Sequence, residues 1–170
     1  EANLAEQAPD FKGRWENIQQ LVQSGKLQRA VEETKTLIPH LPKPQEGYNF
    51  LGVIYELLKN PKQAEAAYLK AFEIEPDSIK TLTNLGTLYA AQNRFDLVFS
   101  YLSPIRKSIQ GNPEACFALI RAALLSQKHD IAQEVIKALK PEIVQQGTLS
   151  LALGSLLQQY EFHEQAVTHF

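Results

Sequence analysis

Residues 48–76 read YNFLGVIYELLKNPKQAEAAYLKAFEIEP. The pair Asn60-Pro61 divides this stretch, because asparagine commonly caps a helix and proline suits the first turn of the helix that follows. Gly52 lies before this pair and Ala64 lies after it, and side chains this small allow two helix backbones to approach closely. The stretch therefore predicts two antiparallel helices joined by a short turn.

The same pattern recurs along the chain with a period of 34 residues. Small residues stand at two places of the repeat, as Ala30, Ala64, Ala132 and Ala166 in one place and as Gly52, Gly86 and Gly154 in the other. Glycine makes up only 8 of the 170 residues, so three glycines in one register indicate a true repeat. The resulting units are 11–44, 45–78, 79–112, 113–146 and a partial unit, 147–170. A period of this length is typical of arrays of stacked helical hairpins.

The second unit resembles the tetratricopeptide repeat, whose pattern runs from an aromatic residue through Leu-Gly, Tyr, Ala and a second aromatic residue to Ala and Pro. The matching residues are Tyr48, Leu51, Gly52, Tyr55, Ala64, Tyr68, Ala71 and Pro76. The resemblance covers residues 11–170 without a gap. It implies an all-α fold, namely an α-solenoid of antiparallel helix pairs wound into a right-handed superhelix. Residues 1–10 are expected to be a lead-in to this domain.

The repeat pattern places two helices in each unit. We expect them at 11–23, 27–38, 45–58, 61–74, 78–91, 94–108, 113–126, 129–139, 147–158 and 161–170. Pro104 falls inside the sixth helix and should kink it or end it early, because proline cannot donate the internal hydrogen bond. Asp77 or Ser78 should cap the fifth helix, and Gly111-Asn112-Pro113 should separate the third and fourth units in the same way.

By its resemblance to the family, the first helix of each unit should line a concave groove. The groove residues of the central units are then Asn49, Val53, Glu56, Lys80, Thr83, Asn84, Thr87, Phe117 and Arg121. An asparagine there can both donate to and accept from the backbone of an extended peptide. Phe117 and Arg121, one helical turn apart, could hold an apolar side chain or a carboxylate.

Several of these residues also have a purely structural interpretation. Asn84 could serve local packing, and Phe117 could fill the seam between units, as buried aromatic residues commonly do. Lys80 and Arg121 could be ordinary solvated surface. One subset of the family clamps the C-terminal carboxylate of chaperone tails, but Glu114 stands where that clamp has a lysine and would repel a carboxylate. Chaperone-tail binding is therefore disfavoured.

The composition is ordinary, with 44% apolar residues, 21% charged residues and a formal net charge of −2. Lys and Arg number 17 against 19 Asp and Glu. A phosphate-binding track would need a positive charge at one place in every unit, but the second position of the successive units holds Lys12, Glu46, Lys80, Glu114 and Thr148. Nucleic acid is therefore not an expected partner. The chain also has no apolar run long enough for a membrane span and no signal-peptide pattern, so direct membrane insertion is not expected.

No catalytic, metal-binding or cofactor-binding pattern stands out in the sequence. Cys116 occupies an inward-facing place and is better explained as a small core residue than as a nucleophile. His163 and His169 are six residues apart, so they do not share a helix face, and neither has a metal-ligand spacing with Cys116. We therefore expect no catalytic residue, metal or cofactor, and the chain is not predicted to be an enzyme.

The sequence predicts a non-enzymatic scaffold that binds a peptide or a partner protein in the concave groove. Two alternatives stay open, namely a docking or regulatory region of a longer enzyme such as a transferase, and a self-assembling module that dimerises through its C-terminal end. Helical arrays normally end in a polar cap, which the last unit lacks, so we expect the natural chain to continue beyond Phe170. The repeat style is typical of bacterial proteins, and the expected compartment is the cytoplasm or the periplasm.

Overall fold

The structure, a computed structural model, describes residues 10–139 together with Gly154, Ser155 and Gln158. All regular elements within this part of the chain are helical, which confirms the predicted all-α fold. Internal contacts divide the chain into two units, Glu1–Pro76 and Asp77–Phe170. Most of the expected fifth repeat lies outside the described residues, and of the two helices predicted there only Gly154, Ser155 and Gln158 are described, all of them helical. The handedness of the superhelix stays a prediction.

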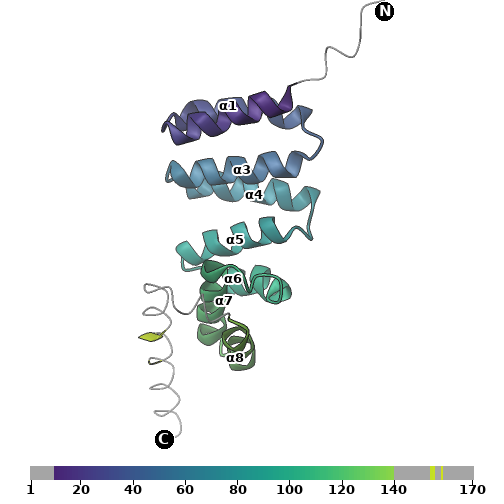
Figure 1. The fold of residues 1–170 in the computed structure, drawn as a ribbon. Coiled ribbons are helices and arrows are strands. Elements are labelled where there is room, and N and C mark those ends of the chain that lie inside the picture. The colour runs from purple at the N-terminus through teal and green to yellow at the C-terminus, as the bar shows by residue number, and fades with distance from the viewer. Residues whose placement is uncertain (1–9, 140–153, 156–157, 159–170) are drawn as a thin grey trace, which may run out of the picture. The chain divides into compact units, whose positions relative to one another are not determined.

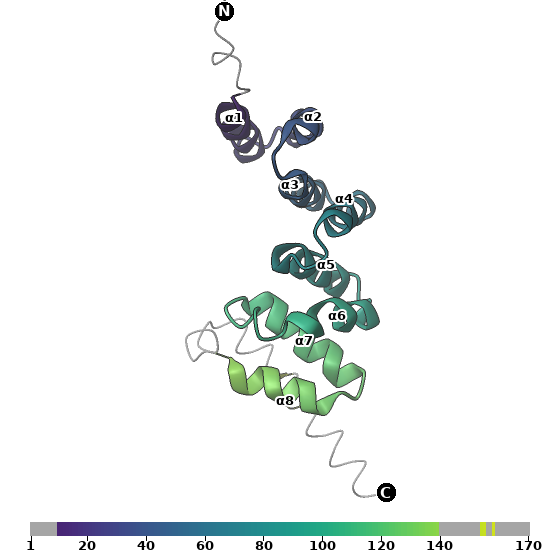
Figure 2. The same ribbon diagram turned by 90° about the vertical axis from the view of Figure 1, so that its right-hand side faces the viewer.

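The first unit is built from α-helices that pack side by side. Its described elements are α1 (Phe11–Gln23), α2 (Leu27–Leu37), the 3-10 helix η2 (Ile38–His40), α3 (Pro44–Leu57) and α4 (Pro61–Ile74). α1 packs along α2, α2 packs against α3, and α3 packs along α4 (Figures 1 and 2). Because short turns join helices that lie along each other, each pair is antiparallel, as predicted.

The second unit repeats this arrangement. Its described elements are α5 (Ile79–Ala91), α6 (Phe95–Leu102), the 3-10 helix η3 (Ser103–Ile105), α7 (Pro113–Leu125) and α8 (His129–Ala138). α5 packs along α6 and α7 packs along α8, while α7 also contacts α5 and α6. α6 ends at Leu102 rather than at residue 108, and the chain continues into η3, which contains Pro104. The predicted early end is confirmed, because proline cannot continue the helical hydrogen-bond ladder.

Polar side chains cap several helices by accepting a hydrogen bond from a first-turn N–H group. Asn60, Ser78 and Asn112 do so at the places predicted from the sequence, at distances of 3.3, 3.4 and 3.0 Å. Asp10 caps α1 in the same way at 2.8 Å, which was not predicted. Of the two candidates before α5, Ser78 is the residue that caps the helix. A cap of this kind stabilises a helix by about 1 kcal/mol.

The turn inside each described helix pair contains one residue with a positive φ. These residues are Gly25, Lys59, Asn93 and Gln127, with φ values of 74°, 56°, 57° and 57°. They are spaced by 34 residues, like the rest of the pattern. The residue after each of them donates its N–H group back to the preceding helix, as Asn60 does to the carbonyl oxygen of Tyr55 at 2.9 Å. This is a Schellman motif, which ends a helix by satisfying its last carbonyl groups.

Gly52 on α3 leaves space for the ring of Tyr68 on α4. A Cβ atom at Gly52 would overlap Cε1, Cδ1 and Cζ of that ring, and Tyr68 is only 1% exposed. Gly86 and Leu102 have the same relationship in the second unit. The glycines therefore make room for a large side chain of the opposite helix. This refines the expectation that they simply bring two backbones together.

In the pair formed by Ile18 and Thr34, the large side chain lies on the first helix and the small one on the second, the reverse of Gly52 and Tyr68. They occupy the repeat positions of Gly52 and Tyr68, one helix pair earlier in the chain. Both are buried, with exposed fractions of 1% and 0%. The Thr34 hydroxyl donates a 2.7 Å hydrogen bond to the carbonyl oxygen of Ala30, which satisfies this buried polar group. A large residue on the first helix thus accompanies a small one on the second, so the total volume at the two positions is kept similar.

Candidate partner-binding surfaces

The first unit presents two of its three predicted groove residues at the surface. Val53 is 37% exposed, and Glu56 is exposed as well. Asn49 lies on the same helix but is only 2% exposed. Its burial follows from the packing of α3, which is contacted by α2, η2 and α4. The amide of Asn49 is therefore a core group with no surface to offer a partner, unlike its predicted place in the groove.

Glu56 has a structural role within its own helix pair. Its Oε1 atom accepts a 2.7 Å hydrogen bond from the hydroxyl of Tyr68. Burial of the phenol, together with the hydrogen bond and the negative charge of Glu56, raises the pKa of Tyr68 well above its ordinary value of 10.0. The carboxylate of Glu56 is thus held by α4 while it stays accessible to solvent.

An aromatic pair joins α1 to α3 in the first unit. The ring centroids of Trp15 and Phe50 are 4.8 Å apart, with an interplanar angle of 46°. Both side chains are half-buried. A tilted pair of this kind contributes about 0.5–1.5 kcal/mol beyond the burial of its area. Phe50 was not predicted from the sequence as a surface residue, although an aromatic residue directly beside a predicted groove position, Asn49, is a signal for such a surface.

Four predicted residues share one face of α5 in the second unit. Lys80, Thr83, Asn84 and Thr87 follow the three- and four-residue spacing that brings side chains together on a helix. Lys80 is exposed and the other three are half-buried. The Thr87 hydroxyl donates to the carbonyl oxygen of Thr83 at 3.0 Å, and it lies 3.2 Å from that of Asn84. This bond orients the hydroxyl, and its oxygen can still accept a hydrogen bond from a partner.

Phe117 and Arg121 lie one turn apart on α7, which packs against α5. Both side chains are half-buried. The Arg121 guanidinium stands over the ring of Phe95, with its Cζ atom 4.8 Å from the ring centroid. A cation–π contact of this kind holds the guanidinium in place and leaves N–H donors at its edge for a carboxylate. Phe95 was not among the predicted site residues, because it belongs to the start of α6 rather than to a groove position.

Few side chains of residues 10–139 are placed to react or to bind a metal ion. Cys116 is 1% exposed, its Sγ donates to the carbonyl oxygen of Ile109 at 3.2 Å, and burial raises the pKa of the thiol to about 11. It is a core residue, as predicted. Among residues 10–139, no group of three or more His, Cys, Asp or Glu side chains could hold a metal ion. In the same part of the chain, none of the helices combines the length and apolar character that a membrane crossing requires.

A known repeat family matches the second unit of the chain. The sequence profile of the tetratricopeptide repeat matches residues 45–78, which are the second unit of the register. Residues 45–78 are thus a tetratricopeptide repeat. Tetratricopeptide repeat protein 37 of Xenopus laevis is 29% identical over 87 residues, which make up 51% of this chain and 6% of the relative. Superkiller complex protein 3 of Homo sapiens is 24% identical over 140 residues, or 77% of this chain and 9% of the relative. The chain thus spans less than a tenth of either relative's length.

Two solved structures share the fold of this chain. PilF of Pseudomonas aeruginosa superposes with a TM-score of 0.69 and 17% sequence identity, over 93% of this chain and 72% of that one. MamA of AMB-1 superposes with a TM-score of 0.66 and 19% identity, over 94% of this chain and 87% of that one. At such low identity the likeness shows the fold, and it does not indicate which partners this chain binds.

Proposed function

We propose that this protein is a non-enzymatic scaffold that binds an extended segment of a partner protein. The proposed surface, the α5–α7 face, comprises Lys80, Thr83, Asn84, Thr87, Phe117 and Arg121. The observation that supports it most is that α5 and α7 pack directly against each other while all six side chains stay exposed or half-buried. The human relative is named as a protein of the Superkiller complex, and a role in holding proteins together agrees with that name.

The chemistry of the α5–α7 face suits a peptide backbone with an anchoring side chain. The amide of Asn84 offers a donor and an acceptor, which match the C=O and N–H groups of an extended chain. Arg121, steadied over Phe95, can bind a carboxylate through two N–H groups. Glu114 is exposed on α7 and adds a negative charge. We therefore expect a peptide of mixed charge rather than a uniformly acidic one.

A peptide selected against the whole chain from a displayed random library provides the probe for the α5–α7 face. The double variant Lys80→Glu/Arg121→Glu should bind it at least about tenfold more weakly, because a charge-assisted hydrogen bond contributes about 1.5–3 kcal/mol. Fluorescence anisotropy measures the affinity, and circular dichroism reports whether the helices are retained.

The matched control is Lys128→Glu/Lys137→Glu, which makes the same change in charge at two exposed residues of the second unit. This control should leave the affinity unchanged within about twofold. Selected peptides that bind the Lys80→Glu/Arg121→Glu variant as tightly as the unmodified protein would show that the α5–α7 face is not the binding surface.

A further inference from the structure

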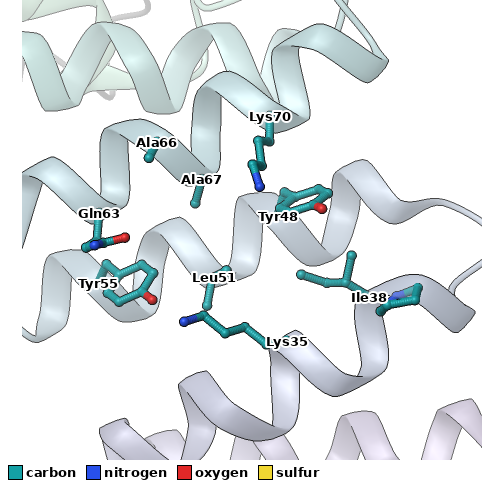
Figure 3. Close-up of a pocket in the computed structure, with 10 residues that line it drawn as sticks. Lys35, Ile38, Tyr48, Leu51, Tyr55, Gln63, Ala66, Ala67 and Lys70 are labelled. Atoms are coloured by element: carbon teal, nitrogen blue, oxygen red, sulfur yellow. The ribbon is translucent and has the colours of Figure 1, made fainter.

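A pocket lies in the first unit among α2, η2, α3 and α4 (Figure 3). Its volume is about 320 Å³, which lies within the range of small ligand-binding pockets. None of the residues predicted for the groove lines it. Its floor is apolar, since the lining side chains of Ile38, Leu51 and Ala67 are 5%, 5% and 4% exposed. We name it the Lys35–Lys70 pocket after its two lining lysines.

Two tyrosines on α3 each form a cation–π contact with a lysine from another helix. The Nζ atom of Lys35 on α2 lies 5.8 Å from the ring centroid of Tyr55, and that of Lys70 on α4 lies 5.6 Å from the ring centroid of Tyr48. Figure 3 shows the two pairs at separate ends of the pocket. Tyr48 and Tyr55 are two helical turns apart, so the pairs are separated by about 10 Å along α3.

The Lys35–Lys70 pocket is positively charged. Both lysines are exposed, and no carboxylate lines the pocket. The carboxylates that α2 and α4 do carry lie outside the lining; they belong to Glu32, Glu33, Glu65 and Glu73. A cation–π contact at an exposed site contributes only about 0.5–1 kcal/mol. Each ammonium group can therefore turn from its ring to a carboxylate, which is a stronger partner.

We propose that the Lys35–Lys70 pocket binds an acidic segment of a partner protein. An apolar side chain of that segment packs on Leu51 and Ala67, and a carboxylate on either side of it meets one of the lysines. An extended peptide covers the distance of about 10 Å with about three residues, whereas a single small anion reaches only one lysine. The phenol hydroxyls of Tyr48 and Tyr55 can donate to the same carboxylates. This surface belongs to the other unit of the chain, and it does not rest on the α5–α7 face.

The test uses the whole chain and two labelled synthetic peptides. The first has Asp and Glu on both sides of a central Leu, and the second carries Asn and Gln in place of the acids. The acidic peptide should bind and the amide peptide should bind at least about tenfold more weakly, with the acidic affinity falling as salt is added. In a nuclear magnetic resonance titration, the acidic peptide should shift the signals of Lys35, Tyr48, Tyr55 and Lys70.

Variants decide whether the two lysines are responsible. Lys35→Glu/Lys70→Glu should weaken acidic-peptide binding at least about tenfold, while Lys35→Arg/Lys70→Arg should preserve it. The matched control is Lys59→Glu/Lys62→Glu, which changes two other exposed lysines of the first unit and should have little effect. The Lys80→Glu/Arg121→Glu variant should leave this binding intact, which separates the pocket from the α5–α7 face.

Three results would overturn the proposal. One is equal binding of the amide peptide, which would show that charge is not recognised. Another is that Lys59→Glu/Lys62→Glu weakens binding of the acidic peptide as much as Lys35→Glu/Lys70→Glu does, which would show that the peptide responds to the net charge of the chain rather than to the pocket. The last is that inorganic phosphate shifts the pocket signals while the acidic peptide does not, which would make this a site for a small anion.

Discussion

The hydroxyl of Tyr68 donates a 2.7 Å hydrogen bond to Oε1 of Glu56, which ties α4 to the surface of α3. The tyrosine is 1% exposed, whereas the glutamate belongs to the exposed residues of its helix. The ring of the same tyrosine fills the space above Gly52. One side chain therefore sets both the packing inside the helix pair and the position of a carboxylate at its surface.

Tyr68 should make the protein sensitive to alkaline pH. Its pKa is raised above 10.0, first by burial and then by Glu56, so the unfolded chain loses this proton before the folded chain does. The contribution of Tyr68 to the free energy of unfolding is therefore complete below pH 10.0 and falls as the pH rises above that value. Tyr68→Phe should lose about 1 kcal/mol near neutral pH and should lack this part of the alkaline decline.

Urea unfolding at about pH 8 and about pH 11 measures this effect. Tyr101→Phe is the control variant, since it removes a phenol on α6 that is only half-buried. Its stability should decline with pH as that of the unmodified protein does. An alkaline decline that is the same in Tyr68→Phe would contradict the role given to the buried phenol.

Gly52 and Tyr68 share one space between the two helices, so substitutions at the two positions should show a coupling energy. Gly52→Ile alone should destabilise the protein by at least about 1–3 kcal/mol, because the new side chain overlaps the ring of Tyr68. Tyr68→Thr alone should also destabilise it, because a buried ring and a hydrogen bond are lost. The double variant reproduces the pairing of Ile18 with Thr34 and should cost less than the two single changes together, by about 1 kcal/mol or more. Strictly additive effects in urea unfolding would show that the two positions do not share one space.

Lys59→Gly should stabilise the protein. Lys59 has a φ of 56°, a left-handed conformation that costs a non-glycine residue about 1–2 kcal/mol. Glycine removes this cost but loses more conformational entropy on folding, so a net gain of about 0.5–1 kcal/mol is expected. Lys59→Ala keeps the unfavourable φ and should bring no such gain. Thermal and urea unfolding compare the three proteins, and a loss of stability in Lys59→Gly would speak against the turn conformation.

Cys116 should react slowly with thiol reagents in the native protein. Its side chain is 1% exposed and burial raises the pKa of the thiol to about 11, so the reactive thiolate is both scarce and shielded. Labelling with a chromogenic disulfide reagent at about pH 8 should be at least about a hundredfold slower than in denaturant. Labelling at the rate of an unfolded thiol would place Cys116 at the surface.

The helical framework could be predicted from the sequence because its signals are local or periodic. Gly52 and Gly86 mark the places where two helices come close together, and Asn60 and Ser78 mark the starts of helices. Pro104 marks the early end of α6. Each of these effects depends on one residue type in one backbone setting, so it can be read without knowledge of the neighbouring helices.

Some features were not predicted because they depend on contacts among several helices. Others depend on a backbone conformation that the residue type does not indicate. Lys59 and Gln127 adopt a left-handed conformation without being glycine, so only the repeat register could have indicated it. Asn49 was expected at the surface from its place in the family's pattern, but contacts of α3 with its neighbours bury it. The pocket lysine Lys35 comes from the repeat before the one that supplies Tyr55, so no single helix contains the pattern.

The central claim is that a partner segment lies along α5 and α7. Nuclear Overhauser contacts between a selected peptide and the isotope-labelled chain test it most directly. We predict contacts from the peptide backbone to the side chains of Thr83 and Asn84, and from an anchoring side chain to Arg121. Contacts confined to α6 and α8, with none to these three residues, would contradict the account.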